Sequence, residues 1–79
     1  GAYTELQRMV RSDDYKLIVY PKAKKILLFD LNNDPLEMND LAENAAFKEV
    51  KEELIVKLKK QMVQMDDPLD LHPYFPELF

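Results

Sequence analysis

The chain has 79 residues, of which 47% are apolar and 33% charged, and its formal net charge is −4. This composition is typical of one small globular domain, because disordered chains carry fewer apolar residues. The acidic balance disfavours nucleic acid and anionic membranes as main partners, and the absence of cysteine excludes disulfides, thiolate catalysis and cysteine-bound zinc.

The first part of the chain predicts an antiparallel sheet of three strands, with a fourth left open. The strand-like runs cover about residues 4–11, 15–20 (YKLIVY) and 25–31 (KILLFDL), and the last two are rich in β-branched, aromatic and aliphatic residues. The turn-forming run SDD at 12–14 and the short run KAK at 22–24 connect them. Connections this short require hairpins, so the sheet is expected to be an antiparallel meander over about residues 4–31.

Apolar side chains fall on both faces of this predicted sheet. Alternation separates Tyr15, Leu17 and Val19 from Lys16, Ile18 and Tyr20 on the second strand. On the third strand it separates Ile26 and Leu28 from Leu27, Phe29 and Leu31. A three-stranded sheet covered by one helix should have one wet face, so the second apolar set needs a cover. Two explanations stay open: a part of a longer protein covers it, or the aromatic C-terminal tail folds back over it.

The remainder predicts a long turn at 32–44, one amphipathic helix over about residues 45–65 and an extended tail at 66–79. Asn44 is the expected N-cap, and Asp66-Asp67-Pro68 is expected to end the helix. The helix carries an apolar stripe of Phe47, Val50, Leu54, Leu58, Met62 and Met65, with Ile55 at its edge. The predicted fold class is therefore α+β, a three-stranded antiparallel sheet packed by one long C-terminal helix.

Two valines on the far side of this helix, Val56 and Val63, lie one heptad apart. Scattered surface valines are normal, but the pair is also a candidate docking seam for another domain.

Residues for catalysis are scarce. His72 is the only histidine and Ser12 the only serine, so neither a metal site nor a nucleophile–base pair is predicted. Asp30-Leu31-Asn32-Asn33-Asp34-Pro35 imitates the start of a calcium loop, but proline stands where glycine is needed, and Leu41 stands where a bidentate glutamate is needed. We expect instead a structural turn in which Asp30 and Asp34 accept backbone hydrogen bonds and Pro35 fixes φ.

The order of these parts resembles the C-terminal region of the formylglycine-dependent sulfatases. The resemblance rests on RMVR at 8–11, DYKLI at 14–18 and LFDLNNDPLEMNDL at 28–41, and extends to about Leu58. In the latter run the family's turn positions correspond to Asp30, Asp34, Pro35, Glu37 and Asn39. Asn39 follows Glu37 by two residues where many members space it by three, and Asp13 and Asp14 replace the usual glycine of the first hairpin.

The resemblance implies a parent enzyme that hydrolyses sulfate esters or sulfamates and is periplasmic or secreted. Its α/β catalytic domain would lie N-terminal to this segment, with a formylglycine nucleophile made from a C/S-x-P/A-x-R motif and with calcium held by carboxylates. This chain would be the smaller C-terminal subdomain, which leans on the catalytic domain and can border the substrate cleft. Candidates for that border are Lys22, Lys24 and His72.

Consistent with a fragment, the chain opens Gly1-Ala2-Tyr3 without an initiator methionine, so we expect it to derive from a longer protein. An isolated chain whose second sheet face has lost its cover is expected to dimerise through that face. The alternative from another class is an autonomous module for protein–protein interaction, using the open sheet face or the Val56/Val63 seam.

Overall fold

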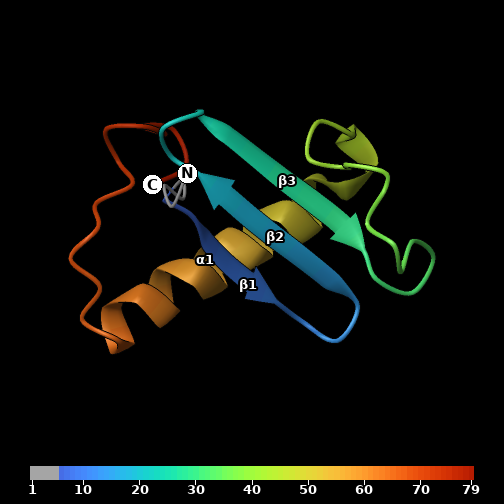
Figure 1. The fold of residues 1–79 in the computed structure, drawn as a ribbon, viewed down its shortest axis with the longest axis horizontal. Coiled ribbons are helices and arrows are strands. Elements are labelled where there is room, and N and C mark those ends of the chain that lie inside the picture. Colours follow the sequence, from blue (N-terminus) through green and yellow to red (C-terminus); the bar gives the residue numbers. More distant parts are fainter. Residues whose placement is uncertain (1–5) are drawn as a thin grey trace, which may run out of the picture.

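The computed structural model describes residues 6–79 and has an α+β fold of two layers, a sheet and a helix (Figure 1). The strands are β1 (Arg8–Arg11), β2 (Tyr15–Tyr20) and β3 (Lys25–Asp30), in the sheet order β1-β2-β3 with both pairings antiparallel. A 3₁₀ turn at Ala45–Phe47 leads into the helix α1 (Lys48–Gln64), which crosses one face of the sheet. The predicted fold class is confirmed.

The two hairpins form as their turn residues predict. In the first, the Ser12 hydroxyl accepts hydrogen bonds from the backbone N–H groups of Asp14 and Tyr15. In the second, the N–H of Lys24 donates to the carbonyl of Pro21 at 3.0 Å, and Lys24 takes a left-handed φ of 52°. The first strand is shorter than the predicted 4–11; residues 4 and 5 lie outside the described part of the chain.

The core lies between α1 and one face of the sheet, which we call the inner face. Leu17 and Leu28 stand opposite each other in the register and are fully buried there, and Leu58 from α1 is fully buried with them. The rest of the buried cluster comes from all elements and the tail: Val10, Val19, Ile26, Ala42, Leu54, Ile55 and Leu71. The inner face is therefore the one that the helix covers, as period-two alternation predicts.

The predicted helix needs two corrections. Met65 is not part of the buried stripe: its exposed fraction is 73%, because α1 ends at Gln64 and the chain turns away there. Asp66 adopts a left-handed φ of 51°. The N–H of Asp66 donates to the carbonyl of Val63, and the N–H of Asp67 donates to the carbonyl of Met62. This Schellman geometry ends the helix before Pro68 can act. Ile55, placed at the edge of the stripe, is fully inside the core.

The helix starts as predicted, with one difference. The Asn44 side chain accepts a hydrogen bond from the N–H of Ala46 at 3.0 Å, so Asn44 is an N-cap. It caps the 3₁₀ turn, and regular α-helix begins only at Lys48.

The C-terminal tail packs on the helix side of the sheet. Leu71 is buried in the core, and Leu69, Phe75, Leu78 and Phe79 pack against that same cluster. The tail is not extended throughout, because it makes two successive turns whose first carbonyls are those of Leu71 and Phe75. It thus completes the inner layer, and the explanation in which the tail covers the second sheet face is not realised.

Candidate functional site

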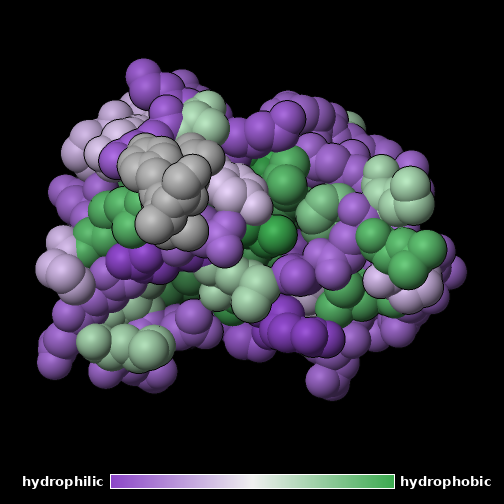
Figure 2. Space-filling view, in the orientation of Figure 1, coloured by the Kyte–Doolittle hydropathy of each residue, from purple (hydrophilic) through white to green (hydrophobic). Residues whose placement is uncertain are grey.

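The second face of the sheet, which we call the outer face, carries a row of apolar side chains outside the main core. Met9, Ile18 and Leu27 stand opposite one another in the register across the three strands. Met9 is 46% exposed, and the other two are half-buried. Figure 2 shows this side of the molecule, with hydrophobic side chains gathered over the middle of the sheet and hydrophilic ones around them.

One end of the outer face is covered by the segment that follows β3. Glu37, from that segment, forms an ion pair with Lys16 on the central strand, with a distance of 2.9 Å between Nζ and Oε1. Phe29, which stands opposite Lys16 in the register, is only 7% exposed, whereas Met9 is 46% exposed. The outer face is therefore more buried at the end that carries the Lys16–Glu37 ion pair than along the row Met9, Ile18 and Leu27.

The covering segment is held by its own carboxylates. Asp34 accepts hydrogen bonds from the N–H groups of Met38 (3.0 Å) and Asn39 (2.9 Å). Asp30 accepts from the N–H groups of Asn32 and Asn33, both at 3.1 Å, and these bonds together with the Asn33 side chain lower the pKa of the Asp30 carboxyl. Glu37 has a left-handed φ of 54°.

The same hydrogen bonds show whether the calcium-like run at 30–35 could bind a calcium ion. The oxygen ligands of the calcium-like run are turned toward amides of their own loop, which is the geometry of Asx turns and differs from a cation cage. Within residues 6–79, no group of three or more acidic or histidine side chains is arranged to hold a metal ion. The residues here thus do not fit the calcium that the resemblance assigns to the parent enzyme.

Part of the backbone at each edge of the sheet is bonded to groups that sequence reasoning did not identify. At β1, the carbonyls of Met9 and Arg11 accept from Gln61 Nε2 (3.3 Å) and Lys57 Nζ (2.7 Å), both on α1. At β3, the N–H of Leu28 donates to Asp40 Oδ1 at 2.9 Å and its carbonyl accepts from the N–H of Leu41. Such edge contacts compete with the addition of a further strand.

A bidentate ion pair fastens the start of the sheet to the end of the helix. Arg8 Nε and Nη2 donate to Asp67 Oδ2 and Oδ1 at 2.5 and 2.9 Å. The hydrogen bonds from Arg8 and from the N–H of Leu69 lower the pKa of Asp67 to about 2. The two residues are 59 positions apart, and no local sequence pattern indicates this pairing.

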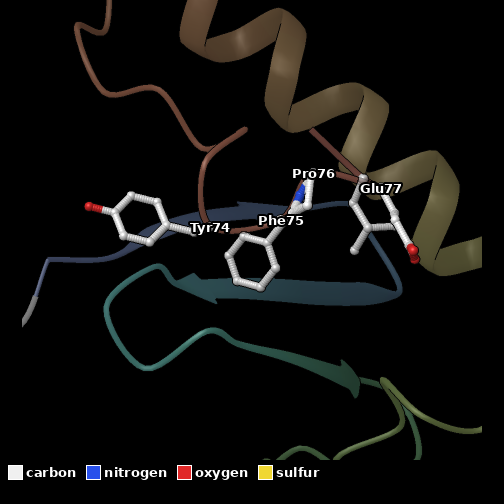
Figure 3. A pocket seen from close by; sticks show the side chains of 5 residues that line it. Tyr74, Phe75, Pro76 and Glu77 are labelled. Atoms are coloured by element: carbon white, nitrogen blue, oxygen red, sulfur yellow. The ribbon is translucent and has the colours of Figure 1, made fainter.

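The three candidates for a cleft border lie on two segments. Lys22 and Lys24 belong to the β2–β3 turn, and His72 to the tail; all three are exposed. His72 lines an open hollow between the tail and α1, together with Lys59 and Phe79, whose ring the Lys59 ammonium approaches at 5.5 Å. Figure 3 shows the neighbouring part of the tail, where Tyr74 and Phe75 point in different directions. Phe75 packs against the core. A role of these residues at a cleft stays a prediction.

The far side of α1 offers a weaker surface. Val56 and Val63 are both exposed, but each stands among charged neighbours, Glu49, Glu52 and Glu53 around the first and Lys59 and Lys60 around the second. In the part of the chain that the structure describes, no helix is both long and apolar enough to cross a membrane.

Residues 6–79 thus form a small α+β domain with a partly covered outer sheet face. Residues 3–65 match the family model described as "N-sulphoglucosamine sulphohydrolase, C-terminal". The chain belongs to this family of sulfatase C-terminal domains. An uncharacterized protein of Haemophilus influenzae is 34% identical over 64 residues, which are 81% of this chain and 32% of that protein. The chain therefore spans about a third of the length of this relative.

Proposed function

We propose that this chain is the non-catalytic C-terminal subdomain of a sulfatase and that it packs on the catalytic domain of its parent protein. The observation that carries the proposal is the match of residues 3–65 to the C-terminal domain of N-sulphoglucosamine sulphohydrolase. The side-chain inventory agrees, because one histidine, one serine and no cysteine give little material for catalysis.

The parent would hydrolyse sulfate esters or sulfamates in the periplasm or outside the cell. Its formylglycine nucleophile and its calcium would both belong to the region upstream of this chain. The subdomain would support the catalytic domain, and its turns would border the substrate cleft, with Lys22, Lys24 and His72 as the candidate contacts.

The test starts with the reading frame of the parent gene. A C/S-x-P/A-x-R motif upstream supports the proposal, and a frame without it favours an autonomous interaction module. The parent protein and the isolated chain are then compared on an aryl sulfate. We expect turnover by the parent alone; turnover by the isolated chain would contradict a non-catalytic role.

The autonomous module remains the second candidate because the outer face is partly open. An isolated chain with this face uncovered is expected to dimerise through it, which sedimentation at rising concentration measures. A clean monomer that binds no hydrophobic dye would count against the expected dimer.

A further inference from the structure

We propose that the outer face of the sheet is the surface through which this chain docks on the catalytic domain, and that the contacting surface of that domain is apolar at its centre and acidic at its border. The inference rests on the proposed function and adds to it the docking surface and the chemistry of the partner.

The outer row is a set of apolar side chains that the described part of the chain covers only in part. Met9, Ile18 and Leu27 form one continuous line across three strands, because they are paired in the register. None of them belongs to the core cluster or to the side chains packed against it. A continuous row of apolar side chains with Met9 exposed and its neighbours half-buried indicates a contact surface, whereas single scattered side chains do not.

The geometry favours docking by the face over docking by an edge. At β1 the carbonyls of Met9 and Arg11 are bonded to α1, and at β3 both backbone groups of Leu28 are bonded to residues 40 and 41. A peptide that adds a strand needs such edge groups to be available. Among residues 6–79, Met9 is 46% exposed and Ile18 and Leu27 are half-buried, so the described part of the chain leaves this face partly open.

The charges of the outer face specify the partner further. The whole chain has four more acidic than basic residues, yet strand alternation places only cations among the charged residues of this face: Arg11, Lys16 and Lys25. Lys16 is paired with Glu37, whereas Arg11 and Lys25 are exposed at opposite ends of the sheet. A partner with carboxylates at the border and apolar side chains at the centre would complement this arrangement.

A rigid segment with exposed apolar side chains adjoins the same face. Leu36 and Met38 are highly exposed on either side of Glu37, whose carboxylate is anchored over Lys16. The hydrogen bonds that Asp34 accepts fix the backbone of Met38 before any partner arrives. Preorganised apolar contacts of this kind lose little conformational freedom on binding.

The partner named here is the catalytic domain rather than a second copy of the chain. The family is that of a C-terminal domain, and the relative from Haemophilus influenzae extends well beyond the matched region, so both place this fold beside further polypeptide. The Val56/Val63 side of α1 is the competing surface, and the experiment below separates the two.

The four methionines of the chain are built-in probes. Met9 lies on the outer face, Met38 on the adjoining segment, Met62 packs against the core, and Met65 is exposed at the end of α1. Hydrogen peroxide oxidises accessible methionine side chains, and peptide mass spectrometry reads each position separately. The parent protein and the dilute isolated chain are oxidised side by side, and slow oxidation of Met62 verifies that both are folded.

We expect oxidation of Met9 and Met38 to be several-fold slower in the parent than in the isolated chain, with Met65 oxidised equally in both. Protection of Met65 without Met9 would assign docking to the helix and overturn the inference, although the proposed function would stand. Equal oxidation of all four would refute docking altogether. Protection of Met9 in the concentrated isolated chain but not in the parent would assign the face to a second copy.

The acidic border is tested by charge reversal in the parent protein. Arg11→Glu with Lys25→Glu should restore much of the oxidation of Met9, whereas Lys60→Glu on the exposed side of α1 is the matched control and should not. If the reversed pair leaves Met9 as protected as before, the partner border is not acidic and that part of the inference is wrong.

Discussion

Two neighbouring residues of β2 test the assignment of the two faces, through the substitutions Leu17→Ala and Ile18→Ala. Leu17 has an exposed fraction of 0% and packs under α1, whereas Ile18 is half-buried on the outer face. Truncating a buried leucine costs about 2–5 kcal/mol, because a cavity remains in addition to the lost transfer free energy. Truncating a side chain already half in water should cost about 1 kcal/mol.

The difference is large on the scale of this domain. A chain of this length has a free energy of unfolding of about 4–12 kcal/mol, so Leu17→Ala removes a large share of it. Urea denaturation followed by circular dichroism measures both variants. With a denaturant slope of about 1 kcal/mol per M, we expect Leu17→Ala to lower the midpoint by about 2 M or more and Ile18→Ala by about 1 M or less.

The same pair is then measured in the parent protein. If the outer face docks, Ile18 becomes buried there, and the cost of Ile18→Ala should rise toward that of Leu17→Ala. Equal midpoints for the two variants in the isolated chain would refute the assignment of inner and outer faces. A cost of Ile18→Ala that stays small in the parent would refute the docking of this face.

Three further predictions concern polar and backbone contacts. Arg8 lowers the pKa of Asp67 to about 2 from an ordinary value of 3.8, so this pair stabilises the fold above about pH 4, and the stabilisation is lost as the pH falls toward 2. Asp67→Asn should therefore make the urea midpoint depend less on pH between 4 and 2. An unchanged dependence of the midpoint on pH in this range would contradict the prediction. Asp34→Ala with Pro35→Ala removes the acceptor of two backbone hydrogen bonds, so the free energy of unfolding should fall by about 1–2 kcal/mol and the melting temperature with it. An unchanged melting temperature would refute the structural role of this turn. Asp66 has a left-handed φ of 51°, which glycine adopts at no steric cost. Asp66→Gly should therefore raise the free energy of unfolding by about 0.5–1 kcal/mol and the urea midpoint with it, and a lowered midpoint would contradict this.

Periodicity predicts the sheet faces because it is a local property. Strand alternation placed Leu17 and Ile18 on opposite sides of the second strand, and Leu27 and Leu28 on opposite sides of the third. The register then pairs Leu17 with Leu28 and Ile18 with Leu27. Alternation also showed that one helix could not cover both sets. The N-cap was predictable for the same reason, since Asn44 bonds to an amide only two residues away.

The sequence does not predict contacts between polar side chains far apart in the chain. Arg8 and Asp67 meet across 59 residues, and Lys57 reaches the carbonyl of Arg11 across 46. By its position in the helix, Lys57 could equally form an i,i+4 ion pair with Glu53, so its actual partner depends on how the helix packs on the sheet. The predicted end of the helix at about Met65 lies within one residue of the end of α1. Its left-handed cap was not predicted, because glycine usually occupies that position and here Asp66 does.

The edges and the outer face together support the proposed docking of this chain. Side chains of α1 and the segment after β3 occupy the edge groups of β1 and β3, which limits pairing with foreign strands. A domain that acts alone gains solubility from polar residues on its open sheet face as well. Here polar contacts close the edges while Met9, Ile18 and Leu27 keep the face apolar, which is the combination that docking by that face requires.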